Sequence, residues 1–420
     1  MAARASAARA EICGVAAMRD MPAFNYITAR FTIPFGMSDN VVVSECRTPA
    51  ERRQFITFQW EIYKGNPYWV PPLVSERMAF YDKSKNPFFA HSDAALFIAR
   101  CNGRVVGTIA AIVNNRHNEF HRECTGFFGG FETVDDFQVA SALFDAARDW
   151  VKARGMNVLR GPATLSLNDE CGLLIDGFDS EPMVLMPYNP PYYVSLVERY
   201  GFKKAMDLWA WWVSSDTARK VIGDRLERLA QLIEKRGRFT LRTADFRRLP
   251  QEVQALKAVY ASESGAWREN WGHVPMTDQE LEHVVNNLKQ FADPDFILIA
   301  EAQGKPIGIA VALPNVNRPL RKAYPNPKTP EWWTLLKFLY YRRKLVNSVR
   351  VILAGVLKEY RGLGIEALMM LRILQTSIRK GYIGGEMSWI LETNDAMNRV
   401  IEQTGARVYK TYRMYDLPIG

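Results

Sequence analysis

A segment near residue 360 has the residue types of an anion-binding turn. In residues 353–366 a β-branched run ends, Arg361, Gly362 and Gly364 follow, and a helical pattern begins at once. Glycines let the backbone turn tightly and bring its N–H groups against a ligand. The first turn of a helix adds unpaired N–H donors and a partial positive charge. The spacing therefore predicts a site suited to a pyrophosphate.

Two other clusters give weaker signals. His117 and His121 stand four residues apart, but no glutamate follows the first histidine directly, as a zinc site of the HExxH type requires. We therefore predict a polar loop there and no metal. The aromatic run 127–131 lies in a predicted strand without basic neighbours, so it indicates core packing and not nucleic-acid stacking.

Around the glycine turn, the sequence resembles the GNAT superfamily of acyl-CoA N-acyltransferases. The pyrophosphate loop of that family reads Arg/Gln-x-x-Gly-x-Gly/Ala, and Arg361 and Gly364 match its first and fourth positions. The last position is Glu366, an acid that does not help to bind phosphate, and Lys358 replaces the usual proline. The resemblance covers about residues 45–417 and implies acyl-CoA as co-substrate, without a metal.

The resemblance also implies which residues contact acyl-CoA. Asn394 opens a helix where the family has an asparagine facing the pantetheine arm, and a backbone N–H near Val356 is expected to stabilise the oxyanion. The expected acyl-CoA-binding residues are Gly355, Val356, Lys358, Arg361, Gly362, Leu363, Gly364, Ile365 and Asn394.

In the mechanism that the resemblance implies, an acceptor amine attacks the thioester directly while a base takes its proton. Glu386 and Glu392 are the candidate bases, and on a continuous strand two residues six apart share one face. The alternatives for either are a surface carboxylate or an ion-pair partner of Arg399 or Arg407.

The general acid of many family members is missing from the expected place. Seven residues beyond Asn394, where those members have a tyrosine that protonates the leaving thiolate, this chain has Ile401. Tyr412 is a candidate substitute, and Tyr409, Tyr415 or water are the alternatives.

The elements that must position these residues occur twice along the chain. Each half has helices, a hairpin, then strand, helix, strand, helix and a last strand; the hairpins join 95–101 to 105–113 and 296–302 to 306–313. The order predicts an α/β fold of two tandem GNAT-like domains, each a mixed, mostly antiparallel twisted sheet flanked by helices. We expect an extension at 1–40, an N-terminal domain at 41–213, a connecting helix at 214–238 and a C-terminal domain at 239–420.

The first half lacks the glycine turn. Asp135 and Asp136 stand where the loop would be, and they cap a helix well but repel an anion. We therefore expect this half not to bind CoA in the usual way. Its Asp169 and Glu170 lie on a predicted loop that would suit an amine acceptor, and a capped turn is the alternative. Together with Trp271 and Pro275, this loop resembles a tandem GNAT subgroup of bacteria.

The composition is that of a globular protein. Hydrophobic residues make up 48% and charged residues 24%, which excludes disordered and collagen-like chains, and 420 residues suit two domains. The five cysteines form no CxxC pair, which argues against disulfides and zinc ribbons and favours a reduced, cytoplasmic location. No apolar run approaches the roughly 18 residues needed to span a bilayer. The Ala- and Arg-rich start predicts a disordered extension or a mis-assigned start, with organellar targeting as the alternative.

Most of the positive charge falls in one insertion. The chain has a formal net charge of +9, and residues 317–347 hold eight basic residues against Glu331 alone, which leaves the rest of the chain near neutral. We therefore expect no nucleic-acid partner. An aromatic run in the insertion has three interpretations: peripheral membrane contact through 318–346, the lining of an acyl tunnel with CoA phosphates at its basic end, or a packed helix.

These observations predict an N-acyltransferase that moves an acetyl or longer acyl group from acyl-CoA to an amine on a small molecule or a lipid. One alternative is a long-chain N-acyltransferase acting on an amino-lipid, as in bacterial ceramide synthases of similar GNAT type, with a sphingoid base as acceptor. The other is a non-catalytic CoA-binding or scaffold protein, suggested by Glu366 and Ile401.

Overall fold

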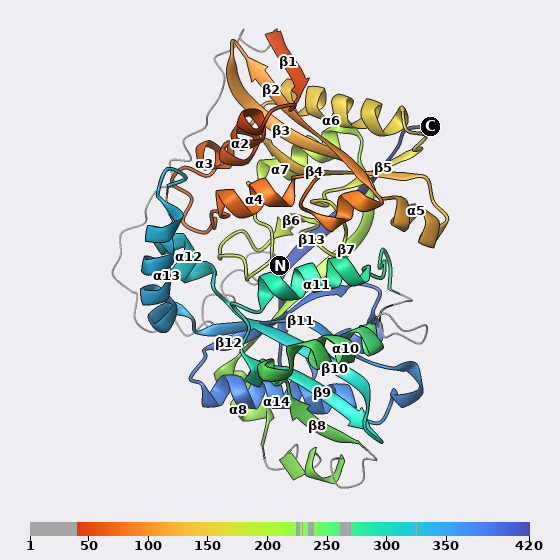
Figure 1. Ribbon diagram of the computed structural model, residues 1–420, viewed down its shortest axis with the longest axis vertical. Helices are drawn as coiled ribbons and strands as arrows, with labels where there is room; N and C mark the ends of the chain where they lie inside the picture. Colours follow the sequence, from red (N-terminus) through yellow and green to blue (C-terminus); the bar gives the residue numbers. More distant parts are fainter. Residues whose placement is uncertain are drawn as a thin grey trace, which may run out of the picture. The chain divides into compact units, whose positions relative to one another are not determined.

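The computed structural model describes residues 40–223, 227–228, 230–233, 239–260, 267, 270–324 and 326–420 (Figure 1). The extension expected at 1–40 lies outside the described residues apart from Asn40. So do parts of the connecting helix expected at 214–238, where a helix is described at Ser215–Val221.

The first half begins with a short strand and continues through the expected hairpin. Its elements are β1 (Val41–Glu45), α2 (Pro49–Thr57), α3 (Gln59–Ile62), α4 (Val74–Phe80), η2 (Pro87–Ala90), β2 (Asp93–Cys101), β3 (Arg104–Val113), α5 (Asn115–His121), β4 (Thr125–Thr133), α6 (Phe137–Lys152), β5 (Val158–Gly161), β6 (Leu173–Asp176), α7 (Tyr192–Tyr200) and β7 (Lys203–Ser214).

The second half repeats that order. Its elements are α8 (Ser215–Val221), β8 (Thr240–Thr243), η3 (Phe246–Arg248), α10 (Leu249–Tyr260), α11 (Asp278–Leu288), η4 (Pro294–Phe296), β9 (Ile297–Ala302), β10 (Lys305–Pro314), α12 (Asn317–Ala323), α13 (Glu331–Leu345), β11 (Ser348–Val356), η5 (Lys358–Tyr360), α14 (Ile365–Arg379), β12 (Gly384–Leu391), α15 (Asp395–Glu402) and β13 (Arg407–Pro418).

Local chemistry explains most of these boundaries. At both hairpins the two turn residues have positive φ, 50° and 78° at Asn102-Gly103, which suits the right-handed twist of the flanking strands. The loop expected around His117 is instead the helix α5, because the Asn114 side chain accepts from the His117 N–H and caps its first turn. The expected α/β architecture with a mostly antiparallel sheet is confirmed.

The two halves share one sheet because their last strands are exchanged. The order is β1-β2-β3-β4-β5-β13-β7-β12-β11-β10-β9-β8, with β6 also paired to β13. The last strand of the chain, β13, pairs with β5 of the first half, and β7 of the first half pairs with β12 of the second. The two exchanged strands pair with each other along most of their length. A linear split at residue 213 does not describe this sheet.

Each half has its own helix packed on the sheet. In the first half, Leu143, Phe144 and Val151 of α6 are completely buried against β1–β4. In the second half, Ile365 and Met369 of α14 are completely buried against β10–β12. This packing fixes the ends of β11 and α14, where the glycine turn lies.

Candidate functional site

The site is built where two parallel strands separate. β11 and β12 pair only from Ser348 with Gly384 to Val351 with Met387. Beyond that point β11 stays with β10 and β12 stays with β7, so the two strands diverge. The register of β11 against β10 shifts and leaves Ile352 as an extra residue, a bulge that re-aims the strand beside the opening.

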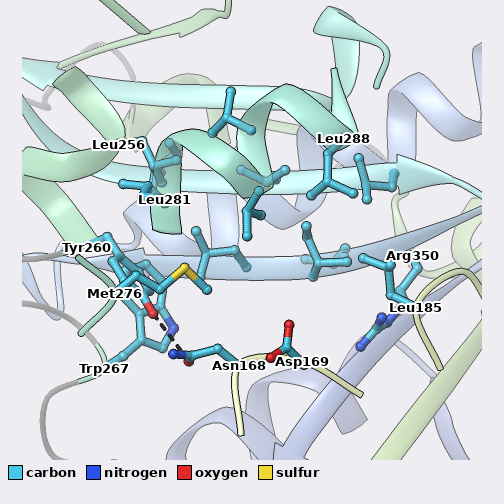
Figure 2. A pocket seen from close by; sticks show the side chains of 18 of the residues that line it. Asn168, Asp169, Leu185, Leu256, Tyr260, Trp267, Met276, Leu281, Leu288 and Arg350 are labelled. Carbon is cyan, nitrogen blue, oxygen red and sulfur yellow. Dashed lines mark hydrogen bonds between the residues drawn. The ribbon is translucent and has the colours of Figure 1, made fainter. Parts of the chain in front are cut away.

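A cavity of about 560 Å³ lies at this separation, a size typical of ligand pockets. It is lined by residues 351–354 of β11, by Met387 and Trp389 of β12, and by α10, α11 and a loop of the first half. Figure 2 shows its apolar side chains, Leu256, Leu281 and Leu288 among them, across the cavity from the polar loop at 168–169. The cavity wall is therefore mainly apolar, with polar side chains from the first-half loop and also from α10 and α11, such as Glu252, Glu280 and His283.

The loop at Asn168–Glu170 supplies polar groups from the first half. The Asn168 side-chain amide donates to the Val274 carbonyl at 2.9 Å, and the Gly272 Cα packs so closely on Leu167 that a Cβ would lie 2.5 Å from it. Two stretches that the sequence analysis linked to one subgroup are thus in contact. The loop of the first half is held against the second half and becomes part of the cavity wall.

Asp169 points its carboxyl group into the cavity (Figure 2). The Ser166 hydroxyl donates to it at 2.9 Å. Burial raises the pKa of Asp169 to about 6, and the hydrogen bond from Ser166 opposes that rise. Its neighbour Glu170 is paired with Arg77 instead. Asp169 therefore titrates close to neutral pH at the polar side of an apolar cavity.

Arg350 and Ser388 line the cavity, while Glu386 is completely buried behind them. Arg350 Nε donates to Ser388 Oγ at 2.8 Å and lies 3.4 Å from Glu386 Oε1. Ser388 and Tyr409 both donate hydrogen bonds to Glu386. Glu386 thus neutralises the buried Arg350 and is not among the described residues that line the cavity.

Glu392 points away from the cavity. It accepts from Lys204 Nζ at 2.7 Å and from the Asp207 N–H at 3.1 Å, and it is not one of the described lining residues. The expectation that Glu386 and Glu392 share a strand face was wrong. The pairing of β12 with β7 shifts register between Met387 and Ile390, and β12 ends at Leu391, so the strand is not continuous between the two glutamates.

The region where a general acid was sought is apolar. Ile401 lines the cavity, as its position seven residues beyond Asn394 suggested. Tyr412 is completely buried, and within the described part of the chain its hydroxyl has no hydrogen-bond partner. Burial raises the pKa of Tyr412 well above its usual range, and the ring packs edge-on against Trp389. It lies behind the described lining residues.

The predicted pyrophosphate loop has the expected backbone form. Gly362 and Gly364 have φ of 78° and 79°, and Gly364 is the N-cap of the 15-residue α14. Within the described residues no side chain caps this end, so the first N–H groups of α14 have no capping acceptor there. Lys358 and Arg361 are exposed beside it, and Leu363 is 55% exposed. The donors and cations present fit a pyrophosphate group.

The remaining expected contacts are divided between the loop and the cavity. Asn394 lines the cavity and caps α15, since its side chain accepts from the Met397 N–H at 3.2 Å. Gly355 and Val356 are buried against β10 and are not among the described lining residues, whereas 352–354 are. Ile365 is buried in the core beneath α14.

In the first half, the equivalent strands do not open. β4 and β5 pair from Thr125 to Phe127, and the Ala163 N–H continues the contact by donating to the Phe128 carbonyl at 2.7 Å. A Cβ on Gly129 would lie 1.9 Å from the Ala163 carbonyl oxygen. The two backbones thus occupy the space that corresponds to the opening between β11 and β12. Asp136 caps α6 at the position that corresponds to the glycine loop of the second half. That this half does not bind CoA in the usual way stays a prediction.

Three parts of the cavity wall were not predicted from the sequence as parts of a site: Arg350, Ser388 and the helix α11. Arg350 could not be told from an exposed basic residue by its neighbours in the sequence. A signal existed in the pattern of β11, where an arginine interrupts an apolar run that otherwise reads as a buried strand.

Comparisons with known proteins identify close relatives. No family model matches the chain. It is 36% identical over 393 residues to the bacterial ceramide synthase of Caulobacter vibrioides, an alignment that covers 91% of this chain and 99% of that protein. It is also 36% identical over 373 residues to protein YghO of Escherichia coli, covering 87% of this chain and 93% of YghO.

Solved structures show the same architecture. A tandem GNAT protein from the clavulanic acid biosynthesis pathway superposes with a TM-score of 0.51 at 12% identity, covering 91% of this chain and 99% of that one. A GCN5-related glucosamine N-acetyltransferase region of a fungal β-N-acetylglucosaminidase gives 0.53 at 14% identity and covers 90% of this chain and 38% of that one. The chain therefore has a tandem GNAT fold and belongs to the family that contains YghO and the bacterial ceramide synthase.

Proposed function

We propose that this protein is an acyl-CoA-dependent N-acyltransferase that joins a long acyl chain to the amine of a lipid-like acceptor. The observation that carries the proposal is the cavity of about 560 Å³ between the diverging strands β11 and β12. Its wall is mainly apolar, which suits alkyl chains. The relative named as a bacterial ceramide synthase supports the same class of product, since a ceramide is an N-acylated amino-lipid.

The glycine loop and the cavity would bind different parts of the substrates. The uncapped start of α14 with Lys358 and Arg361 would hold the pyrophosphate of the donor. Asn394 and residues 352–354 would orient the thioester arm at the cavity. The backbone N–H groups of that bulged segment replace the region near Val356 as the proposed oxyanion contact. Alkyl chains would lie against α10 and α11.

Asp169 is the base that we propose for the amine. In the transfer, the amine nitrogen forms the amide bond, the carbon–sulfur bond breaks, and the base accepts the proton that the amine loses. A carboxyl with a pKa of about 6 is mostly ionised at neutral pH and still basic enough to take part. Glu170 is neutralised by Arg77, and Glu392 by Lys204.

The test is product formation with matched donors and acceptors. Purified protein is incubated with acetyl-CoA or palmitoyl-CoA, each with a sphingoid base or with a water-soluble amine, and amide products are measured by mass spectrometry. We expect amide mainly from the long-chain donor with the sphingoid base. Product from acetyl-CoA and a soluble amine alone would refute the long-chain assignment. Binding of CoA without turnover of any pair would support a scaffold protein instead.

A further inference from the structure

The outward face of α13 is unusually apolar for a surface helix. Its exposed large hydrophobic residues include Trp332 at 66% and Tyr340 at 58%, and the others are Trp333, Leu335, Leu336 and Leu339. Monomeric soluble proteins rarely expose a contiguous apolar patch of this kind. Figure 1 shows α13 lying beside α12.

These six residues form one stripe. At about 100° per residue, Leu335, Leu339, Trp332, Leu336, Tyr340 and Trp333 follow one another around roughly 160° of the helix. The opposite side is anchored: Thr334 and Phe338 are buried, and Phe338 packs with Val184, Leu313 and Val316. The helix is thus fixed on the protein with its apolar stripe turned outward.

The charge around the stripe has one sign. Arg342, Arg343 and Lys344 form the last turn of α13, and Lys344 donates to the Tyr340 hydroxyl at 2.8 Å. The one acid of the helix, Glu331, accepts from the Ser75 N–H of α4 at 3.0 Å and is thereby turned toward the first half. The exposed stripe therefore carries aromatic, leucine and basic residues without an acid.

We propose that α13 docks on the surface of a lipid bilayer that contains anionic lipids. Tryptophan and tyrosine favour the headgroup level, leucines enter the upper acyl region, and each basic residue near the surface contributes about 1 kcal/mol of attraction. Among the described residues, no helix is long and apolar enough to cross a membrane, so α13 would lie in the plane of the interface. A second copy of the chain would bring the same positive charge, whereas an anionic bilayer complements it.

Docking through α13 would place the cavity near the lipid. The core beneath α13 includes Leu313, Leu288 and Ile352, and these three residues also line the cavity. If the proposed function is right, a lipid acceptor would reach the cavity from the side of α13. This consequence rests on the proposed function, but the docking itself does not.

The test is flotation of the full-length protein with vesicles of phosphatidylcholine, with and without phosphatidylglycerol. We expect flotation with the mixed vesicles and little with phosphatidylcholine alone. The double variant Trp332→Gln/Leu336→Gln should lose flotation. Arg343→Glu, which changes the charge by two units, should lower the vesicle partition coefficient at least about tenfold. Ile383→Gln, which removes an equally exposed apolar side chain elsewhere, and Lys152→Glu on α6 are the matched controls.

Three outcomes would overturn the proposal. One is absence of the wild-type protein from the vesicle fraction, and another is flotation that survives the double variant. The third is a wild-type dimer, seen by analytical ultracentrifugation, that the double variant dissociates, because the stripe would then be an interface between copies. Amide formation from detergent-dispersed substrates is measured in parallel. Loss of flotation with retained turnover separates failure of docking from failure of the proposed function.

Discussion

The carboxylates of this protein differ in their surroundings more than in their chemistry. Asp169, Glu386 and Glu392 lie within or close to the same site, yet one faces the cavity, one neutralises a buried arginine and one forms a half-exposed ion pair. Their roles follow from these partners and not from residue type.

Replacing Asp169 with asparagine should lower kcat at least about a hundredfold, because the amide cannot accept the amine proton. The wild-type rate should fall as the pH drops through about 6, since protonation of Asp169 removes the base, and the variant should lack this acidic limb. The measurement is the pH profile of amide formation. Glu392→Gln is the matched carboxylate control and should retain turnover. The reverse pattern in the two variants would contradict the base assignment.

Replacing Tyr412 with phenylalanine should leave turnover unchanged and stability equal or slightly higher. Its buried hydroxyl has no partner within the described residues, so its removal relieves an unsatisfied polar group. Tyr193→Phe is the contrasting variant, because the Tyr193 hydroxyl donates to Glu132 at 2.8 Å and accepts from the Thr133 N–H. We expect that variant to lose about 1–3 kcal/mol in urea unfolding. A large loss of kcat in Tyr412→Phe would mean that Tyr412 is the general acid that protonates the leaving thiolate.

At the scale of elements, the proposed donor site can be tested by a substitution at the start of α14. Gly364→Asp should weaken acyl-CoA binding at least about tenfold, since it places a carboxylate among the N–H groups meant for phosphate. Aspartate tolerates positive φ better than most residues and is a good N-cap, so the helix itself should persist. Isothermal titration with palmitoyl-CoA measures the effect.

The matched control for this variant is Gly381→Asp. Gly381 follows the other end of α14 and has nearly the same φ, 75° against 79°, with open space for a Cβ. It carries nearly the same backbone strain and the same new charge but lies away from the loop. At Gly364 the added Cβ would also lie 3.0 Å from Ile233 Cδ1, the far end of a flexible side chain that can turn aside. Equal weakening in both variants would mean that strain in the fold, and not the phosphate site, explains the loss.

At the scale of the whole described chain, the exchanged strands join the halves. β13 completes the first half beside β5, and β7 completes the second half beside β12. Arg160 of β5 also donates to Asp416 of β13 at 2.8 and 2.9 Å. Neither half has its full sheet without a strand from the other.

Fragments split between α8 and β8 should therefore be insoluble when expressed singly and should co-purify when expressed together. The physical reason is that each fragment alone leaves a long strand edge unpaired and its core uncovered. Co-purification through a tag on one fragment, with the circular dichroism spectrum of the pair, measures this. Two soluble, separately folded halves would contradict the exchanged sheet as a folding unit.

The sequence by itself determined the order of elements, the two hairpins and the glycine turn. Asn102-Gly103 and Gly362–Gly364 work through local backbone preferences, so their neighbours in the chain are sufficient to specify them. The resemblance to the GNAT superfamily rested on the same local residues, and the comparison with solved structures confirmed the fold that it implies.

Only the tertiary structure decided which side chains meet. Asp169 lies more than 180 residues before Arg350, and both line one cavity because the first-half loop packs against Val274. A register shift in β12 places Glu392 beside Lys204, and the exchange of β7 and β13 joins the two halves in one sheet. Local patterns specify a strand but not its neighbour or its register, because both depend on which distant side chains become buried together.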